Sequence, residues 1–174
     1  MSSSEDPSVD TPIRAGRRFL RVGRETGLLR EVFSKATPKL AWNVVRHGLG
    51  VRTLHEIQAA SHPDRLALVD DATSLTYEQA NNQVNQLGHA LRDRLGIRRG
   101  NPVILMMENR VEYLVSWFAL FRIQASGVHA SYRMTAEELE YQVEHSGARV
   151  LFVSAESLDA ARRLADERDD LDLT

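Results

Sequence analysis

The apolar and polar positions that follow residue 65 alternate between short strand-like runs and longer stretches with helical periodicity. The strand-like runs cover residues 66–69, 74–76, 103–107, 127–130 and 150–153. The first two flank Asp70–Thr73, whose residue types suit a turn, and so predict a β-hairpin. The runs at 103–107 and 150–153 are continuously apolar, which is typical of strands buried on both faces of a parallel sheet.

Segments with helical periodicity occupy the intervals between these runs. One apolar face consists of residues spaced three or four apart, namely Ala80, Val84, Leu87, Leu91 and Leu95. Gly96 is expected to end this helix. Further helices are predicted from Asn109 to Ile123, where nearly every position is apolar, and from Ala155 to about Arg168.

Two of the helices begin with a capping signal. Thr76 precedes Gln79 by three residues, and Thr135 precedes Glu138 by three, which is the spacing of a capping box. Gly147 is placed to end the second of these helices. The order of elements predicts an α/β fold, a partial doubly wound and mainly parallel sheet with a leading β-hairpin. Only about three strands follow the hairpin, so we expect an incomplete subdomain of a larger fold.

The first part of the chain differs from the rest in charge. Residues 1–52 carry ten Lys/Arg and five Asp/Glu, a net charge of +5, whereas the remaining residues carry a net charge of −7. We predict a disordered tail at 1–10, a basic helical extension at 11–50 and an acidic body at 51–174. The arginines and leucines of 13–46 suit peripheral contact with an anionic membrane surface. These basic residues are not interleaved with aromatic ones, so no nucleic-acid partner is expected.

Composition excludes several classes of protein. Of the 174 residues, 43% are hydrophobic and 26% are charged, as in soluble globular proteins. No apolar stretch reaches the roughly 18 residues of a membrane-spanning helix, and the polar start does not resemble a secretory signal. Cysteine is absent, which excludes disulfides and thiolate chemistry and suits a cytoplasmic location.

No complete catalytic or metal-binding motif occurs in the sequence. Gly48-Leu49-Gly50 lacks the third glycine and the lysine of a phosphate-binding loop, and the only lysines are Lys35 and Lys39. The histidines are scattered, without a pair at metal-ligand spacing, so no metal site is predicted. His129 lies on a predicted strand before a loop and is expected to be structural.

Three arginines are the candidate anion-binding residues. Arg133 lies in a strand-to-helix loop, the place where open α/β sheets bind ligands. Arg162 and Arg163 lie in the helix that follows the next strand. Because the body has no lysine, recognition of a phosphate there depends on arginine or on backbone N–H groups.

An ordered series of stretches carries a resemblance to a known family. The main ones are His62–Val69, Leu75–Gln79, Gly100–Val103, Met107–Tyr113, Tyr132–Leu139 and His145–Val150. Over about residues 51–165 they resemble the N-terminal part of the adenylate-forming (AMP-binding) enzymes, which include acyl-CoA synthetases, adenylation domains of peptide synthetases and luciferases. The long front extension and the sequence around Asn109 and Tyr132 are most similar to bacterial fatty acyl-CoA synthetases.

The resemblance implies a reaction. Such enzymes use ATP and Mg²⁺ to convert a carboxylate, here a fatty acid, into an acyl-adenylate, and then transfer the acyl group to CoA. Positioned cations and backbone donors stabilise the phosphoryl charge that develops. By similarity to the acetyl-CoA synthetase branch, Arg133, Arg162 and Arg163 are expected on the CoA side. No residue of this chain is assigned a catalytic role.

The sequence departs from the family in two ways. It lacks the phosphate loop with its lysine, the magnesium motif, the ribose-binding aspartate and the catalytic lysine. We therefore expect a fragment that is inert alone, binds ATP, Mg²⁺ and CoA at most weakly, and has the remainder of the enzyme as its partner. The second departure is Gln124, which stands where the family carries small residues and is expected to disturb close packing.

Two alternatives to the enzyme fragment remain. One is a non-enzymatic interaction module that pairs with a partner through an open sheet edge or through the basic front. The other is a scaffold associated peripherally with the inner face of the membrane. Both retain the predicted fold and differ only in what the chain binds.

Overall fold

The computed structural model describes residue 25, residues 51–168 and residues 171–173. The chain divides into two units, Met1–Gly48 and Leu49–Thr174. Every described residue except Glu25 belongs to the second unit, which is the subject of the following paragraphs.

Several predictions concern the first unit. The tail at 1–10 and, Glu25 apart, the membrane-contact segment at 13–46 lie outside the described residues. The proposed boundaries at residues 10 and 50 therefore stay predictions. Within the part of the chain that is described, no helix has the length and apolar character needed to span a bilayer.

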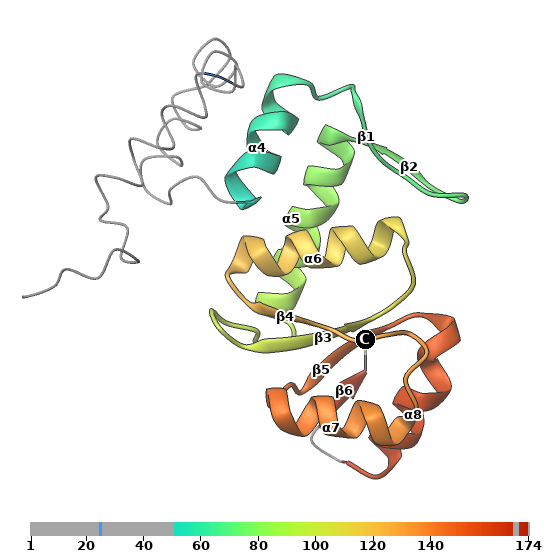
Figure 1. Cartoon of the computed structure of the whole chain (residues 1–174). Coiled ribbons are helices and arrows are strands. Elements are labelled where there is room, and N and C mark those ends of the chain that lie inside the picture. Colours follow the sequence, from blue (N-terminus) through green and yellow to red (C-terminus); the bar gives the residue numbers. More distant parts are fainter. Residues whose placement is uncertain (1–24, 26–50, 169–170, 174) are drawn as a thin grey trace, which may run out of the picture. The chain divides into compact units, whose positions relative to one another are not determined.

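The main sheet contains four parallel strands in the order β4-β3-β5-β6 (Figure 1). Their bounds are Pro102–Met106 for β3, Ser126–His129 for β4, Val150–Val153 for β5 and Asp172–Leu173 for β6. In register, Ile104 of β3 lies beside Val128 of β4 and Leu151 of β5. A separate antiparallel hairpin joins β1 (Leu66–Val69) to β2 (Ser74–Thr76).

Helices cover both faces of the main sheet. Figure 1 shows α4 (Val51–Ser61), α5 (Tyr77–Asp93) and α6 (Val111–Ile123) on one side, and α7 (Ala136–Ser146) and α8 (Leu158–Asp166) on the other. A short 3₁₀ turn, η1 (Ala155–Ser157), precedes α8. The arrangement confirms the predicted doubly wound, parallel sheet with a leading hairpin.

The continuous apolar run of β3 follows from this layering. Because side chains alternate along a strand, Val103 and Leu105 enter the core beneath α5 and α6, whereas Ile104 and Met106 enter the core beneath α7 and α8. All four side chains are fully buried. A strand packed on both faces has no solvent side, which is why its sequence shows no alternation.

Both predicted capping boxes are present. The Thr76 hydroxyl oxygen accepts from the Gln79 N–H at 3.3 Å, and the Thr76 N–H donates to the Gln79 side chain at 2.9 Å. Thr135 and Glu138 form the equivalent pair at the start of α7. Gly147 ends α7 in the left-handed conformation at φ 69°, as predicted.

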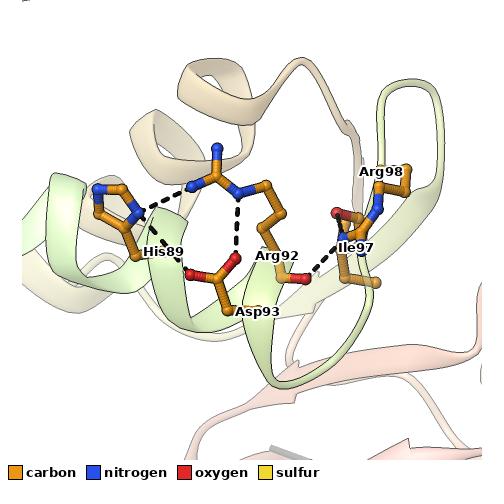
Figure 2. A network of polar contacts seen from close by, with 5 residues as sticks. All are labelled: His89, Arg92, Asp93, Ile97 and Arg98. Atoms are coloured by element: carbon orange, nitrogen blue, oxygen red, sulfur yellow. Dashed lines mark hydrogen bonds and ion pairs between the residues drawn. The ribbon is translucent and has the colours of Figure 1, made fainter.

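The predicted end of α5 was wrong by a few residues. The helix stops at Asp93, before Leu95 and Gly96. Arg98 folds back, and its guanidinium donates to the carbonyl oxygens of Arg92 at 2.6 Å and Ile97 at 3.2 Å (Figure 2). An arginine from the following loop therefore satisfies a carbonyl at the helix terminus.

The start of α6 also differs from the prediction. The helix begins at Val111 rather than at Asn109, and the N-cap Arg110 makes no side-chain capping hydrogen bond. The Asp70 carboxylate supplies the cap from the hairpin turn, accepting from the Val111 N–H at 2.8 Å. Its other oxygen accepts from the N–H groups of Ala72 and Thr73, at 2.9 and 2.7 Å. Asp70 thus shapes the predicted turn and joins the hairpin to α6.

Candidate functional site

A cleft of about 530 Å³ lies where β4 and β5 lead into the helices α7 and α8. Its lining comes from the β4–α7 loop, the first turn of α7, η1 and α8. The lining residues are Tyr132, Arg133, Met134, Thr135, Ala136, Glu137, Glu156, Ser157, Asp159, Ala160 and Arg163. This is the carboxyl edge of the parallel sheet, where open α/β folds bind their ligands.

Hydrogen bonds within the loop and to β3 and η1 hold the β4–α7 loop in place. The Ala130 N–H donates to the Leu105 carbonyl of β3 at 3.0 Å, which extends the sheet pairing by one residue. The Met134 N–H donates to the Ser131 carbonyl at 3.1 Å. The hydroxyl of the buried Ser157 donates to the Tyr132 carbonyl at 3.3 Å, so η1 and the loop are tied together.

Two helices begin at the cleft. Ala136 and Glu137 belong to the first turn of α7, and Asp159 and Ala160 to the first turn of α8. A helix N-terminus carries partial positive charge and N–H groups without intrahelical partners. The N-cap of α7 is closed by its capping box, whereas Ser157 makes no side-chain capping hydrogen bond to α8.

The structure brings two of the three predicted arginines together. All three side chains are exposed; Arg133 and Arg163 line the cleft, whereas Arg162 lies outside its lining. The Arg133 Nε donates to the Tyr132 hydroxyl at 3.0 Å, and its guanidinium carbon lies 5.1 Å from the centre of that ring. Successive residues of a helix point about 100° apart, which is why Arg162 and Arg163 cannot both face one cleft.

Three carboxylates accompany the two arginines in the lining, namely Glu137, Glu156 and Asp159. The backbone N–H of Glu137 itself, then the Thr135 side chain and the Arg163 charge lower the pKa of Glu137. The pKa of Glu156 is also lowered, first by its own backbone N–H and then by the Glu108 side chain. With two cations and three anions, the cleft can bind an anion only where the guanidinium groups and helix N-termini outweigh the carboxylates.

His129 does not join this cleft. It is exposed on the edge strand β4, where the Tyr113 hydroxyl lies 2.5 Å from its Nδ1. The Trp117 ring lies edge-on to the imidazole, with 5.4 Å between the ring centres. Its place on an edge strand agrees with the sequence prediction, and its structural role stays a prediction. In the part of the chain that the structure describes, no group of three or more potential ligands is arranged to hold a metal ion.

Sequence reasoning missed the acidic half of the cleft. Glu137 and Asp159 lie in the first turns of helices that follow parallel strands, and acidic residues there are ordinarily explained by the helix dipole. The available signal was the alternation of helices with parallel strands, which predicts that the two helices lie on one face of the sheet. Two helices on the same face must begin at the same edge of a parallel sheet.

Comparison with known proteins completes the description of the site. The model of the AMP-binding enzyme family matches residues 55–173. A 3-hydroxybenzoate–CoA ligase from Aromatoleum sp. (strain CIB) is 32% identical over 104 residues, which are 60% of this chain and 20% of the ligase. Long-chain fatty acid transport protein 2 of Rattus norvegicus is 32% identical over 117 residues, 66% of this chain and 19% of that protein.

A solved structure gives the same picture. The N-terminal domain of FACL13 from Mycobacterium tuberculosis superposes with a TM-score of 0.63 and 27% identity, covering 70% of this chain and 32% of that one. The chain therefore spans about a fifth of the length of these two curated relatives and about a third of this solved domain.

Proposed function

The chain belongs to the AMP-binding enzyme family, and on that premise we propose that it forms part of an ATP-dependent fatty acyl-CoA synthetase. Such an enzyme joins a fatty acid to AMP with release of pyrophosphate and then exchanges AMP for CoA. The similarity to a long-chain fatty acid transport protein supports a fatty acyl substrate. A CoA ligase among the relatives supports the second half-reaction.

The part that we assign to this chain is a wall of the CoA site. The observation that carries this proposal is the placement of Arg133 and Arg163 at one cleft, beside the N-termini of α7 and α8. Arginine offers fixed donors and a permanent charge to a phosphate group. The cleft volume of about 530 Å³ suits a nucleotide-sized group.

No comparable set of residues for binding ATP or Mg²⁺ is found in this sequence or among the described residues. Residues 51–174 contain no lysine and no glycine-rich phosphate loop, and the described residues contain no cluster of metal ligands. We therefore assign ATP and Mg²⁺ to other parts of the enzyme, which are also the partner of this chain. The 174-residue chain by itself is expected to form no acyl-adenylate.

Titration of the purified chain with CoA tests the assignment of the cleft. We expect weak binding that Arg133→Ala and Arg163→Ala each weaken by about fivefold, the size of an exposed charge-assisted contact. Arg162→Ala is the matched control, because it removes the same charge from the adjacent residue outside the cleft. Equal losses in all three variants, or no binding of CoA at millimolar concentration, would overturn the proposal.

A pyrophosphate-release assay tests the inertness of the chain. With ATP, Mg²⁺ and fatty acids of several chain lengths, the purified chain is expected to release pyrophosphate at the rate of the buffer blank. A catalytically dead variant of a full-length relative, purified in the same way, is the control for contaminating activity. Pyrophosphate release by the chain above both the blank and this control would refute the assignment of catalysis to other parts of the enzyme.

A further inference from the structure

Two buried serines connect the sheet to the β4–α7 loop. Ser154 follows β5 and is 9% exposed, and Ser157 ends η1 and is 2% exposed. The Ser157 hydroxyl oxygen lies 3.3 Å from the Ser154 hydroxyl oxygen and 3.3 Å from the Tyr132 carbonyl oxygen. A carbonyl has no proton to donate and a hydroxyl has one, so Ser157 donates to Tyr132 and Ser154 donates to Ser157. The Ser154 N–H donates to the Met106 carbonyl of β3 at 3.2 Å, which anchors the series in the sheet.

The side chain of Tyr132 extends this connection to Arg133. Its hydroxyl accepts from the Arg133 Nε at 3.0 Å, and its ring centre lies 5.1 Å from the guanidinium carbon. Among the described residues, these are the only hydrogen-bond and ring contacts of the Arg133 guanidinium. Its two Nη groups therefore keep their N–H donors for a ligand, and such a pair can bind two oxygens of one phosphate.

We propose that Ser157 and Tyr132 are positioning residues, which orient the Arg133 guanidinium in the cleft before a ligand binds. The inference deepens the proposed function and rests on it only in naming CoA as the ligand. Ser157 holds the backbone of Tyr132 from the buried side, and the ring and hydroxyl of Tyr132 hold Arg133 from the cleft side. Ordering an arginine side chain costs rotamer entropy, so an arginine that is already ordered loses less of it when the ligand binds.

Burial distinguishes Ser157 from the other serine that contacts this loop. The Ser131 hydroxyl oxygen accepts from the Arg133 backbone N–H at 3.3 Å, but Ser131 is exposed, so water can replace its hydroxyl. Ser157 is buried, and loss of its hydroxyl leaves the Tyr132 carbonyl without this partner. An unpaired polar group away from water destabilises the arrangement that contains it. The loop is therefore expected to respond to the loss of the Ser157 hydroxyl.

Exchange of arginine Nε protons with water, measured by NMR on the full chain, tests the inference without any ligand. Arg162 is the reference, because it is exposed and lies outside the cleft lining. In the natural chain the Arg133 Nε–H is expected to exchange about fivefold more slowly than that of Arg162, as one net hydrogen bond implies. Tyr132→Phe keeps the ring and removes the acceptor, and Ser157→Ala removes the donor that holds the loop. Both variants are expected to raise the Arg133 rate toward that of Arg162.

Two variants outside the cleft are the matched controls. Tyr141→Phe removes a hydroxyl from an exposed tyrosine of α7, and Ser116→Ala removes one from a buried serine of α6. Neither residue lines the cleft, so neither variant should change the Arg133 rate, and circular dichroism establishes that each variant is folded. Equal rates for Arg133 and Arg162 in the natural chain would overturn the inference. So would an Arg133 rate that Tyr132→Phe or Ser157→Ala leaves at the level of its control.

Titration with CoA separates this inference from the proposed function. Tyr132→Phe and Ser157→Ala are each expected to weaken CoA binding by about two- to threefold, the size of a weak exposed contact. In the Arg133→Ala background neither is expected to have a further effect, because both act through that guanidinium. If the exchange rates change as expected but the natural chain does not bind CoA, the positioning of Arg133 stands and the proposed function fails. A loss of CoA affinity that persists in full without Arg133 would overturn the positioning.

Discussion

The end of α6 offers a direct test of how the backbone shapes this fold. Gln124 adopts the left-handed conformation there, with φ 62° and ψ 27°, and is the only non-glycine residue with positive φ in the described part of the chain. This conformation costs a residue with a Cβ about 1–2 kcal/mol. Glycine avoids the cost, so Gln124→Gly is expected to stabilise the protein.

The magnitude follows from two opposing terms. Relief of the left-handed conformation contributes about 1–2 kcal/mol, while the greater freedom of glycine in the unfolded chain offsets about 0.4–1 kcal/mol. The side chain of Gln124 is exposed, and no hydrogen bond of that side chain is found among the described residues. Its backbone bonds, including the one from the Gly100 N–H at 2.8 Å, are retained. The net gain is about 1 kcal/mol, or a melting temperature about 3 °C higher.

Urea and thermal unfolding of three variants check this reasoning. Gln124→Ala keeps the Cβ and is expected to be close to the natural chain in stability. Gly147→Ala makes the reverse change at φ 69°, where an added Cβ meets no atom within 4 Å, so its loss of about 1 kcal/mol reports backbone strain alone. The account is refuted if Gln124→Gly is no more stable than Gln124→Ala while Gly147→Ala is destabilised.

Three further predictions concern the core and two titrating groups. Leu105→Ala removes a fully buried β3 side chain and is expected to lower the free energy of unfolding by about 2–5 kcal/mol in urea titrations; a loss below 1 kcal/mol contradicts the two-faced burial of β3. Burial and then the Arg122 charge lower the pKa of His55, whose ring stacks on Phe118 at 4.9 Å. The unfolded chain therefore takes up a proton on His55 at a higher pH than the folded chain does, and the free energy of unfolding should fall as pH drops below about 6.5. His55→Phe should remove this dependence of the melting temperature on pH. The Val111 N–H, and then that of Ala72, lower the pKa of Asp70, so the natural chain should melt at a higher temperature than Asp70→Asn at pH 7. This difference should vanish as pH falls through the folded pKa of Asp70, and a difference that persists in acid would show that the charge is not responsible.

Gln124 destabilises the protein in a different way from the one predicted. The sequence comparison suggested that its bulk would disturb close packing. In the structure the side chain points into solvent at the helix end, so the cost lies in the backbone. The sequence gives the residue type. Whether its side chain packs against a neighbour or its backbone adopts the left-handed conformation depends on where the helix ends.

Local features of this protein were determined by the sequence itself. Both capping boxes, the hairpin turn and the apolar strands depend on residues that are close along the chain, so their patterns are legible without the fold. The alternation of these elements also predicted the layered parallel sheet. The family resemblance rested on the same ordered stretches, and the family match at residues 55–173 confirmed it.

Only the tertiary structure decided which distant residues meet. The cap of α6 comes from Asp70, which lies 41 residues before Val111. Of three candidate arginines, all of them exposed, Arg133 and Arg163 line the cleft and Arg162 lies outside it. Glu137 of the first turn of α7 lines the same cleft. The cleft arises because each helix returns onto the same face of the sheet, and no local pattern of residue types encodes which side chains meet there.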